Sequence, residues 1–200
     1  MQDHIAGRVK FRRSVTAKAG NVWLANAELD VYTKLSRSVV ATMLPEVDHK
    51  LECAVVEHAF DRAARSSELS QASLDGFAAM HCRETLTDLL NSVSNLNVTT
   101  RRVNQKKKGP FVAANNRLSG RSLRVLSLEQ HARAGAAREL VDDGTWHHIE
   151  QAVLESGSRF GEVVQELSDD ASMHADGRKL LRATEDELGR VLSLLKLQEA

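Results

Sequence analysis

Apolar side chains recur every three or four residues along most of this chain, and this spacing constrains the fold more than any other feature. It places the apolar groups on one face of a helix, which must then be buried against another element. The chain has two prolines and an aromatic content of only 4%, which disfavours all-β folds rich in turns. We therefore expect an all-α chain whose 200 residues form one medium domain, with or without an additional helix.

The periodicity predicts where the helices begin and end. Pro45 breaks the first helix, while Glu46 and Asp48 lie in the first turn of the second, where the helix dipole favours acidic side chains. The expected helices cover residues 23–43, 46–65, about 67–96, 121–143, 145–155 and 184–198.

The C-terminal part is expected to be an extension of the bundle. Ser156, Gly157 and Gly161 predict a weak or broken connection after residue 155, although the apolar spacing of Phe160, Val163, Val164 and Leu167 leaves open a helical segment as far as Ser168. Thr184 and Glu187 fit a capping box at the start of the last, amphipathic helix, although Leu180 and Leu181 leave open a start one turn earlier. The expected organisation is a basic N-terminal arm (1–22), a helical bundle (23–157) and a C-terminal extension (158–200).

A long basic segment is the main functional signal. Residues 89–128 contain no Asp or Glu but eight cations, whereas residues 129–176 carry eleven acidic and three basic side chains in a chain of zero net charge. Such a segment favours a polyanion partner, most often nucleic acid. Because the helical periodicity of apolar residues stops at about residue 96, we expect residues 95–120 to form a long loop between the third and fourth helices. The predicted RNA-binding residues are Arg101, Arg102, Lys106, Lys107, Lys108, Arg117, Arg121 and Arg124.

Metal and catalytic chemistry find no support in the sequence. No phosphate-binding glycine loop, nucleophile elbow or paired-carboxylate pattern occurs, so we expect no enzyme, no cofactor and no small-molecule substrate. The two cysteines cannot form a disulfide framework, and the absence of an apolar N-terminal run or membrane span predicts a soluble protein of a reducing compartment. The nearest approaches to a metal site are His147 beside His148, His49 with Cys53, and His81 with Cys82, each with too few ligands.

A series of short motifs extends along residues 20–157. In order, they are Trp23 with Glu28-Leu29, Val55-Val56 with Phe60, Leu86-Thr87-Asp88-Leu89-Leu90, Arg101-Arg102, Arg124-Val125 with Arg133, Glu139-Leu140, and Gly144-Thr145. Their order resembles that in the coat proteins of rod-shaped, tobamovirus-type (Virgaviridae-like) plant RNA viruses. Proteins of that family are four-helix bundles that assemble helically around single-stranded RNA and hold its phosphates with arginines beside a long inner loop.

The resemblance implies a structural coat or nucleocapsid protein, found in the virion and the host cytoplasm, whose partners are RNA and further copies of itself. It also implies that Arg101, Arg102 and Arg124 bind phosphates and that Arg133 lies deeper, paired with a carboxylate such as Asp88. Family members often carry carboxylates near the inner loop that drive disassembly, but residues 89–128 have none, so this switch does not carry over. The basic arm and the residues after Gly157 also extend beyond the family pattern.

Two alternatives belong to other functional classes. One is a nucleic-acid-binding regulator that acts as a small oligomer, such as an RNA silencing suppressor. The other is a helical adaptor that docks a partner through the leucine stripe of residues 184–198.

Overall fold

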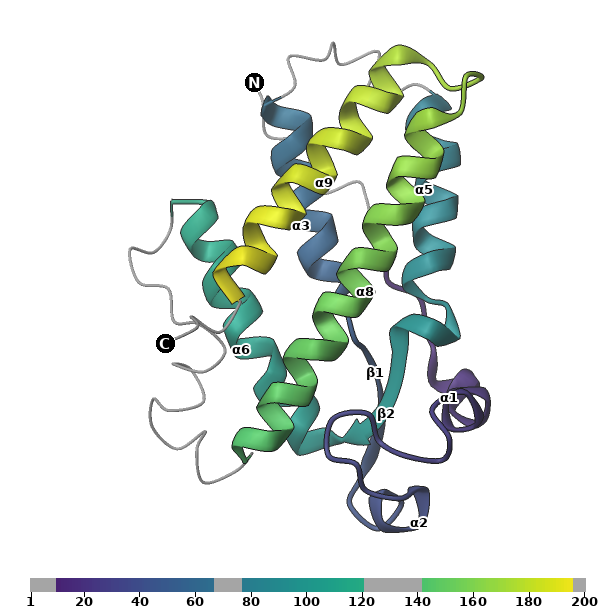
Figure 1. The fold of residues 1–200 in the computed structure, drawn as a ribbon, viewed down its shortest axis with the longest axis vertical. Coiled ribbons are helices and arrows are strands. Elements are labelled where there is room, and N and C mark those ends of the chain that lie inside the picture. The colour runs from purple at the N-terminus through teal and green to yellow at the C-terminus, as the bar shows by residue number, and fades with distance from the viewer. Residues whose placement is uncertain (1–9, 67–76, 121–141, 196–200) are drawn as a thin grey trace.

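The computed structural model describes residues 10–66, 77–120 and 142–195, and within these ranges the chain is mostly helical with one two-stranded sheet (Figure 1). The expected helical class is therefore confirmed. The helices are α1 (Ala19–Ala25), α2 (Arg37–Val40), α3 (Cys53–Ser66), α5 (Phe77–Leu90), α6 (Arg101–Leu118), α8 (Asp143–Asp169) and α9 (Ala175–Leu195). Two 3₁₀ turns, Thr16–Lys18 and Val93–Asn95, and the strands β1 (Pro45–His49) and β2 (Leu96–Thr100) complete the described elements.

Helix α9 contacts four other helices of the helical body. It packs along α3 and α8 and also touches α5 and α6, while α8 and α9 form an antiparallel pair in front of α3 and α5 (Figure 1). The apolar periodicity of these helices produces the core, in which Phe60, Ile149, Phe160, Leu181 and Val191 are almost completely buried.

The break expected after residue 155 is wrong, because α8 continues through both glycines to Asp169. Gly157 lies where the side chain of Leu192 from α9 packs against α8: a Cβ there would lie 2.6 Å from Leu192 Cδ1, so the end of that side chain would have to shift. The glycine therefore serves helix packing, and the expected boundary at residues 157 and 158 falls within α8.

The last helix begins earlier than expected. Thr184 is fully buried inside α9, where its Oγ1 donates a hydrogen bond of 2.8 Å to the Leu180 carbonyl. The predicted capping box is thus wrong. Glu187 instead accepts a 2.7 Å hydrogen bond from Arg62 Nε of α3.

The single helix expected over residues 23–43 is also wrong. The chain reverses between α1 and α2, and Ala27, Glu28 and Lys34 adopt positive φ without being glycines. The fully buried Asp30 stabilises the reversal: its carboxylate accepts hydrogen bonds from Tyr32 N, Thr33 Oγ1, Asn97 Nδ2 and Thr99 Oγ1 at 2.6–3.0 Å. The two bonds within the turn and the two to β2 together compete successfully with helix continuation.

Strand pairing overrides helix formation in two further places. Residues 45–49 form β1, so the helix expected from residue 46 begins only at Cys53, although its second half is confirmed as α3. Its antiparallel partner β2 pairs Pro45 with Thr100 and His49 with Leu96. The helix expected over residues 67–96 ends at Leu90 where it is described, and the long loop expected at 95–120 is wrong because those residues form β2 and α6.

The described part of the N-terminal arm packs onto the body. Phe11 is fully buried, and its ring meets that of Phe60 edge-on with 6.1 Å between centroids. Asn91 Nδ2 donates a 2.7 Å hydrogen bond to the Phe11 carbonyl. The helix predicted over residues 121–143 lies, up to residue 141, outside the described residues.

Candidate nucleic-acid interface

Helix α6 carries most of the predicted RNA-binding residues and begins directly where β2 ends. Thr100 caps it, since its Oγ1 accepts a hydrogen bond from the Val103 N–H at 3.3 Å. The Arg101 N–H donates to the Leu44 carbonyl at 2.9 Å, which ties the first turn to the start of β1. The helix continues through Pro110, whose cost is about 3 kcal/mol in a helix interior, so strong tertiary contacts must hold it.

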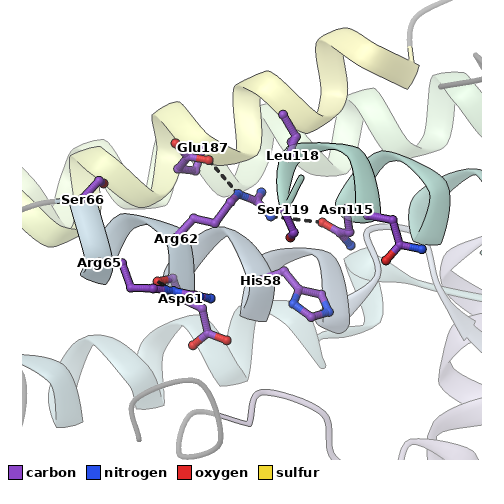
Figure 2. Close-up of a pocket in the computed structure, with 10 residues that line it drawn as sticks. His58, Asp61, Arg62, Arg65, Ser66, Asn115, Leu118, Ser119 and Glu187 are labelled. Carbon is purple, nitrogen blue, oxygen red and sulfur yellow. Dashed lines mark hydrogen bonds and ion pairs between the residues drawn. The ribbon is translucent and has the colours of Figure 1, made fainter. Parts of the chain in front are cut away.

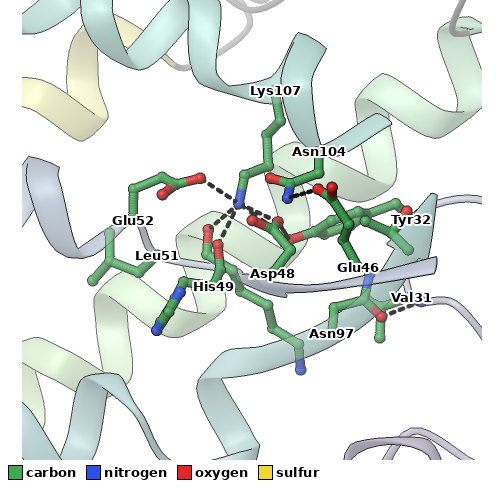
Figure 3. A network of polar contacts seen from close by, with 12 residues as sticks. Val31, Tyr32, Glu46, Asp48, His49, Leu51, Glu52, Asn97, Asn104 and Lys107 are labelled. Carbon is green, nitrogen blue, oxygen red and sulfur yellow. Dashed lines mark hydrogen bonds and ion pairs between the residues drawn. The ribbon is translucent and has the colours of Figure 1, made fainter. Parts of the chain in front are cut away.

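Lys107 supplies the strongest of these contacts. Its side chain is completely buried, and its ammonium donates to Asp48 Oδ2 at 2.6 Å and to Tyr32 Oη at 3.3 Å (Figure 3). Glu52 Oε1 lies 3.3 Å from the same nitrogen. The main-chain carbonyls of His49 and Lys50 accept further hydrogen bonds from it. The side chain thus joins α6 to β1 and to the start of α3.

The charges of this network depend on one another. Burial lowers the pKa of Lys107, but Asp48 and Glu52 more than offset this, so the pKa lies above its usual range and the group stays cationic. Burial raises the pKa of Asp48 to about 6, against the influence of Lys107. The pKa of Glu52 is lowered, because Lys107 outweighs the effect of burial.

The predicted RNA contact of Lys107 is therefore wrong. A phosphate could reach its ammonium only by displacing two buried carboxylates. The residue instead holds α6 in place and so positions the other cations of the helix.

The exposed face of α6 is basic. Arg102 and Arg117 are exposed, and Lys106 and Lys108 are half-buried. Arg102, Lys106 and Arg117 share one side of the helix at its 3.6-residue repeat. Because α6 contains no acidic residue, nothing on the helix itself neutralises this face.

Arg101 lies at the edge of this face and is held by an acidic partner. Its Nε donates to Glu46 Oε1 at 2.7 Å, while Asn104 Nδ2 donates to the other oxygen of that carboxylate. The hydrogen bond from Arg101 is the main cause that lowers the pKa of Glu46. The Arg101 guanidinium remains half-exposed, so it can still approach a phosphate from the solvent side.

The remaining predicted residues are not brought together within the described chain. Arg121, Arg124 and Arg133 lie outside the described residues. Asp88, the expected partner of Arg133, is exposed and forms a 2.6 Å ion pair with Arg13.

A polar cleft of about 590 Å³ opens where α3 and α6 end (Figure 2). Arg62 points across it toward Glu187 and also donates to Asn115 Oδ1 at 3.4 Å. Its lining residues are His58, Asp61, Arg62, Arg65, Ser66, Asn115, Asn116, Leu118, Ser119 and Glu187. The sequence did not indicate this cleft, because its walls come from three separate helices.

Metal ligation has no basis in the described residues, which contain no cluster of three His, Cys, Asp or Glu side chains able to hold an ion. His49 is buried with Nε2 3.1 Å from Asn91 Oδ1, and His148 Nδ1 lies 2.9 Å from the Tyr32 carbonyl. Burial raises the pKa of the Cys53 thiol to about 12, which makes it a poor ligand or nucleophile. None of the described helices is both long and apolar enough to cross a membrane.

The Lys107 network was missed at the sequence level, although one signal was present. Lys107 occupies the same helical side as Val103, Pro110, Phe111 and Ala114, all of which are buried. A lysine within such a stripe indicates a buried cation and therefore distant carboxylate partners.

The fold and the basic face define a helical protein with a candidate surface for polyanions. Comparison with known proteins adds no assignment: no protein-family model, no curated protein and no solved structure matches the chain.

Proposed function

We propose that this chain is the structural subunit of a helical coat or nucleocapsid that polymerises on single-stranded RNA. The observation that carries the proposal is the exposed, acid-free face of α6, on which Arg102, Lys106 and Arg117 follow one line. RNA phosphates lie along this face and displace the counterions of its cations, so that the contact depends on charge rather than on base sequence.

The distribution of acidic residues supports this assignment. Glu155, Glu162, Glu166 and Asp169 recur on one exposed side of α8. Arg159 and Arg182 pair with Glu162 and Asp169 only, so this side keeps a net negative charge. RNA is repelled from that side and attracted to α6, which gives each subunit one polarity relative to the strand. Such polarity is what a coat requires when every subunit meets the same RNA in the same orientation.

The rigid attachment of α6 also supports a coat. In the proposal, the helices packed around α9 form the four-helix unit of a rod-shaped-virus subunit, and Lys107 fixes α6 to it. The basic surface is then a helix rather than the flexible inner loop expected from the sequence. The partners are RNA and further copies of this chain, and the location is the virion and the host cytoplasm.

The contact with RNA is tested by removing two cations of the basic face of α6. Arg102→Ala with Lys106→Ala should weaken binding to a single-stranded RNA oligomer and reduce the slope of log K against log salt by about 1.4, because each phosphate contact on a single strand contributes about 0.7. The matched control is Arg159→Ala with Arg182→Ala, which removes two exposed cations from α8 and α9. Equal binding by the two double variants would refute the proposed RNA face.

The two alternatives make different predictions. A regulator that acts as a small oligomer binds RNA but forms no rods, so sedimentation of the RNA complex distinguishes it from a coat. The adaptor needs an exposed leucine stripe on the last helix, but Leu188 and Val191 are buried against this chain's own core. The structure therefore gives the adaptor no support.

A further inference from the structure

An exposed apolar surface lies on the segment between the end of α1 and the start of β1. Six large apolar side chains are exposed in the described part of the chain, and five of them belong to this segment: Leu24, Leu29, Val39, Met43 and Leu44. Leu24 is 71% exposed and Leu44 is 67% exposed. We call residues 24–45 the apolar lobe. Large apolar side chains gathered in this way usually mark an interaction site, whereas single ones scattered over a surface do not.

Short-range contacts hold the apolar lobe together as one unit. The Arg37 N–H donates to the Glu28 carbonyl at 2.9 Å, and Leu29 forms an isolated β-bridge with Ser36. The inner side of the lobe packs through Val40 into a small core that it shares with β2. Figure 1 shows α1 and α2 beside the strands, at the end of the molecule away from the turn between α8 and α9. The exposed apolar side chains therefore sit on a packed unit at one end of the molecule.

The backbone of the lobe is strained. Ala27, Glu28, Lys34 and Leu44 have φ between 54° and 60°, and no other non-glycine residue in the described ranges has a positive φ. Leu44 gains no burial in return for this conformation, because two thirds of it stays in solvent. Strain of this kind clusters where a surface has a function.

The charges of the lobe are nearly balanced. Its four charged residues are Glu28, Asp30, Lys34 and Arg37, of which Asp30 is completely buried in the turn. Arg37 Nη1 lies 3.3 Å from Glu28 Oε2, and both side chains are about half-exposed. RNA and anionic membranes are bound by clusters of cations, which this lobe lacks. A partner with an apolar surface and paired charges of its own fits best.

We propose that the apolar lobe joins two copies of this chain in the absence of RNA, with a two-fold axis that sets one lobe against the other. Outside the lobe, Val112 is the only large apolar side chain that the described residues expose, so within that part of the chain the lobe of a second copy offers the matching chemistry. A two-fold contact must be complementary to itself. The lobe meets this condition, because Glu28 of each copy can face Arg37 of the other.

The size of the lobe also suits a dimer. Its five large apolar side chains and the exposed Ala25, Ala27, Ala41 and Pro45 offer apolar surface on the order of 500 Å², comparable with the largest patch on a typical monomer. A standard interface buries about 800 Å² on each partner, of which slightly more than half is apolar. The lobe can therefore supply the apolar part of such an interface.

The inference goes beyond the proposed function. Subunits on RNA share one orientation, whereas a two-fold axis reverses one copy relative to the other. The pair is therefore the form of the protein before it meets RNA.

Sedimentation equilibrium of the full chain, freed of nucleic acid by nuclease and high salt, measures the pair directly. At tens of micromolar, the unaltered chain should have the mass of two copies. Leu24→Glu with Met43→Glu should raise the dissociation constant about 100-fold or more, because charges replace two apolar groups on each side of the contact. Val112→Glu, which places the same charge at an exposed apolar position of α6, should leave the dissociation constant unchanged. Circular dichroism checks that each variant folds.

A charge exchange tests the two-fold arrangement. Glu28→Arg alone sets arginines against each other across the axis, and Arg37→Glu alone sets glutamates against each other, so each variant should dissociate more readily than the unaltered chain. An equimolar mixture of the two variants restores opposite charges at both contacts and should form mixed pairs. A mixture that stays monomeric would refute the two-fold arrangement.

Two further results would overturn the proposal. One is an unaltered chain that sediments as a monomer, or as a dimer that Leu24→Glu with Met43→Glu does not weaken. The other is a monomer that floats with phosphatidylserine vesicles, which would assign the apolar lobe to a membrane surface. Because no RNA is present in these measurements, their outcome is separate from the tests of the proposed function.

Discussion

Replacing Lys107 by methionine tests how α6 is held against the sheet. Methionine retains the length and much of the apolar stem but removes the ammonium that lies 2.6 Å from Asp48 Oδ2 and 3.3 Å from Glu52 Oε1. Both carboxylates then remain buried without a cation. Removing one partner of a buried ion pair costs about 3–5 kcal/mol, which for a chain of this length lowers Tm by roughly 6–20 °C.

The assay is urea denaturation at pH 7.5, followed by circular dichroism. Lys106→Met is the matched control, because the half-buried side chain of Lys106 makes no ion pair with the described residues. The free energy of unfolding of this variant should differ from that of the unaltered chain by about 0.5 kcal/mol or less. A loss below about 1 kcal/mol in Lys107→Met would refute the idea that the buried ammonium anchors α6.

A triple variant separates charge from packing. Adding Asp48→Asn and Glu52→Gln to Lys107→Met neutralises every formal charge of this cluster, so most of the lost stability should return. A triple variant as unstable as Lys107→Met alone would assign the loss to the shape of the side chain.

Two further predictions concern stability. Gly189→Ala, with nothing within 4 Å of its Cβ, should raise the free energy of unfolding by about 0.5–1 kcal/mol in chemical denaturation. Gly157→Ala should gain less than this, because its Cβ would meet Leu192 Cδ1 at 2.6 Å and the end of that side chain must shift. A larger gain for Gly157→Ala than for Gly189→Ala would contradict the packing described for α8 and α9. Burial raises the pKa of Asp61 from 3.8 to about 6, so between these pH values the folded chain holds a proton that the unfolded chain releases. The contribution of this group to stability therefore falls as pH rises from about 4 to 6. Asp61→Asn should remove this pH-dependent contribution. The free energy of unfolding is measured at pH 4.5 and pH 7 for the unaltered chain and for Asp61→Asn, and an equal change between the two pH values in both proteins would contradict the prediction.

Sequence reasoning succeeded where the helices carry continuous apolar stripes. The second half of α3 was predicted from its own periodicity because its buried face repeats at helical spacing. The glycines of α8 led to the wrong prediction of a break after residue 155. Whether Gly157 ends a helix or makes room for a neighbouring side chain depends on Leu192, which lies in another helix.

Other errors arose from long-range contacts. Residues 26–36 reverse around Asp30, two of whose partners are Asn97 and Thr99 of β2, far away in the sequence. Gly109 and Pro110 indicated a loop by local rules, yet α6 forms through them because Lys107 is held by acids from β1 and the residues before α3. The cluster of cations was visible from the sequence, but which cation is buried depended on the fold.

Electron microscopy of the purified chain mixed with single-stranded RNA shows whether the protein polymerises on RNA. A coat subunit should form rods whose length increases with the length of the RNA. Arg102→Ala with Lys106→Ala should reduce the number of rods at moderate salt, while Arg159→Ala with Arg182→Ala should not. A chain that stays as separate particles of fixed small size, whatever the length of the RNA, would contradict a coat function.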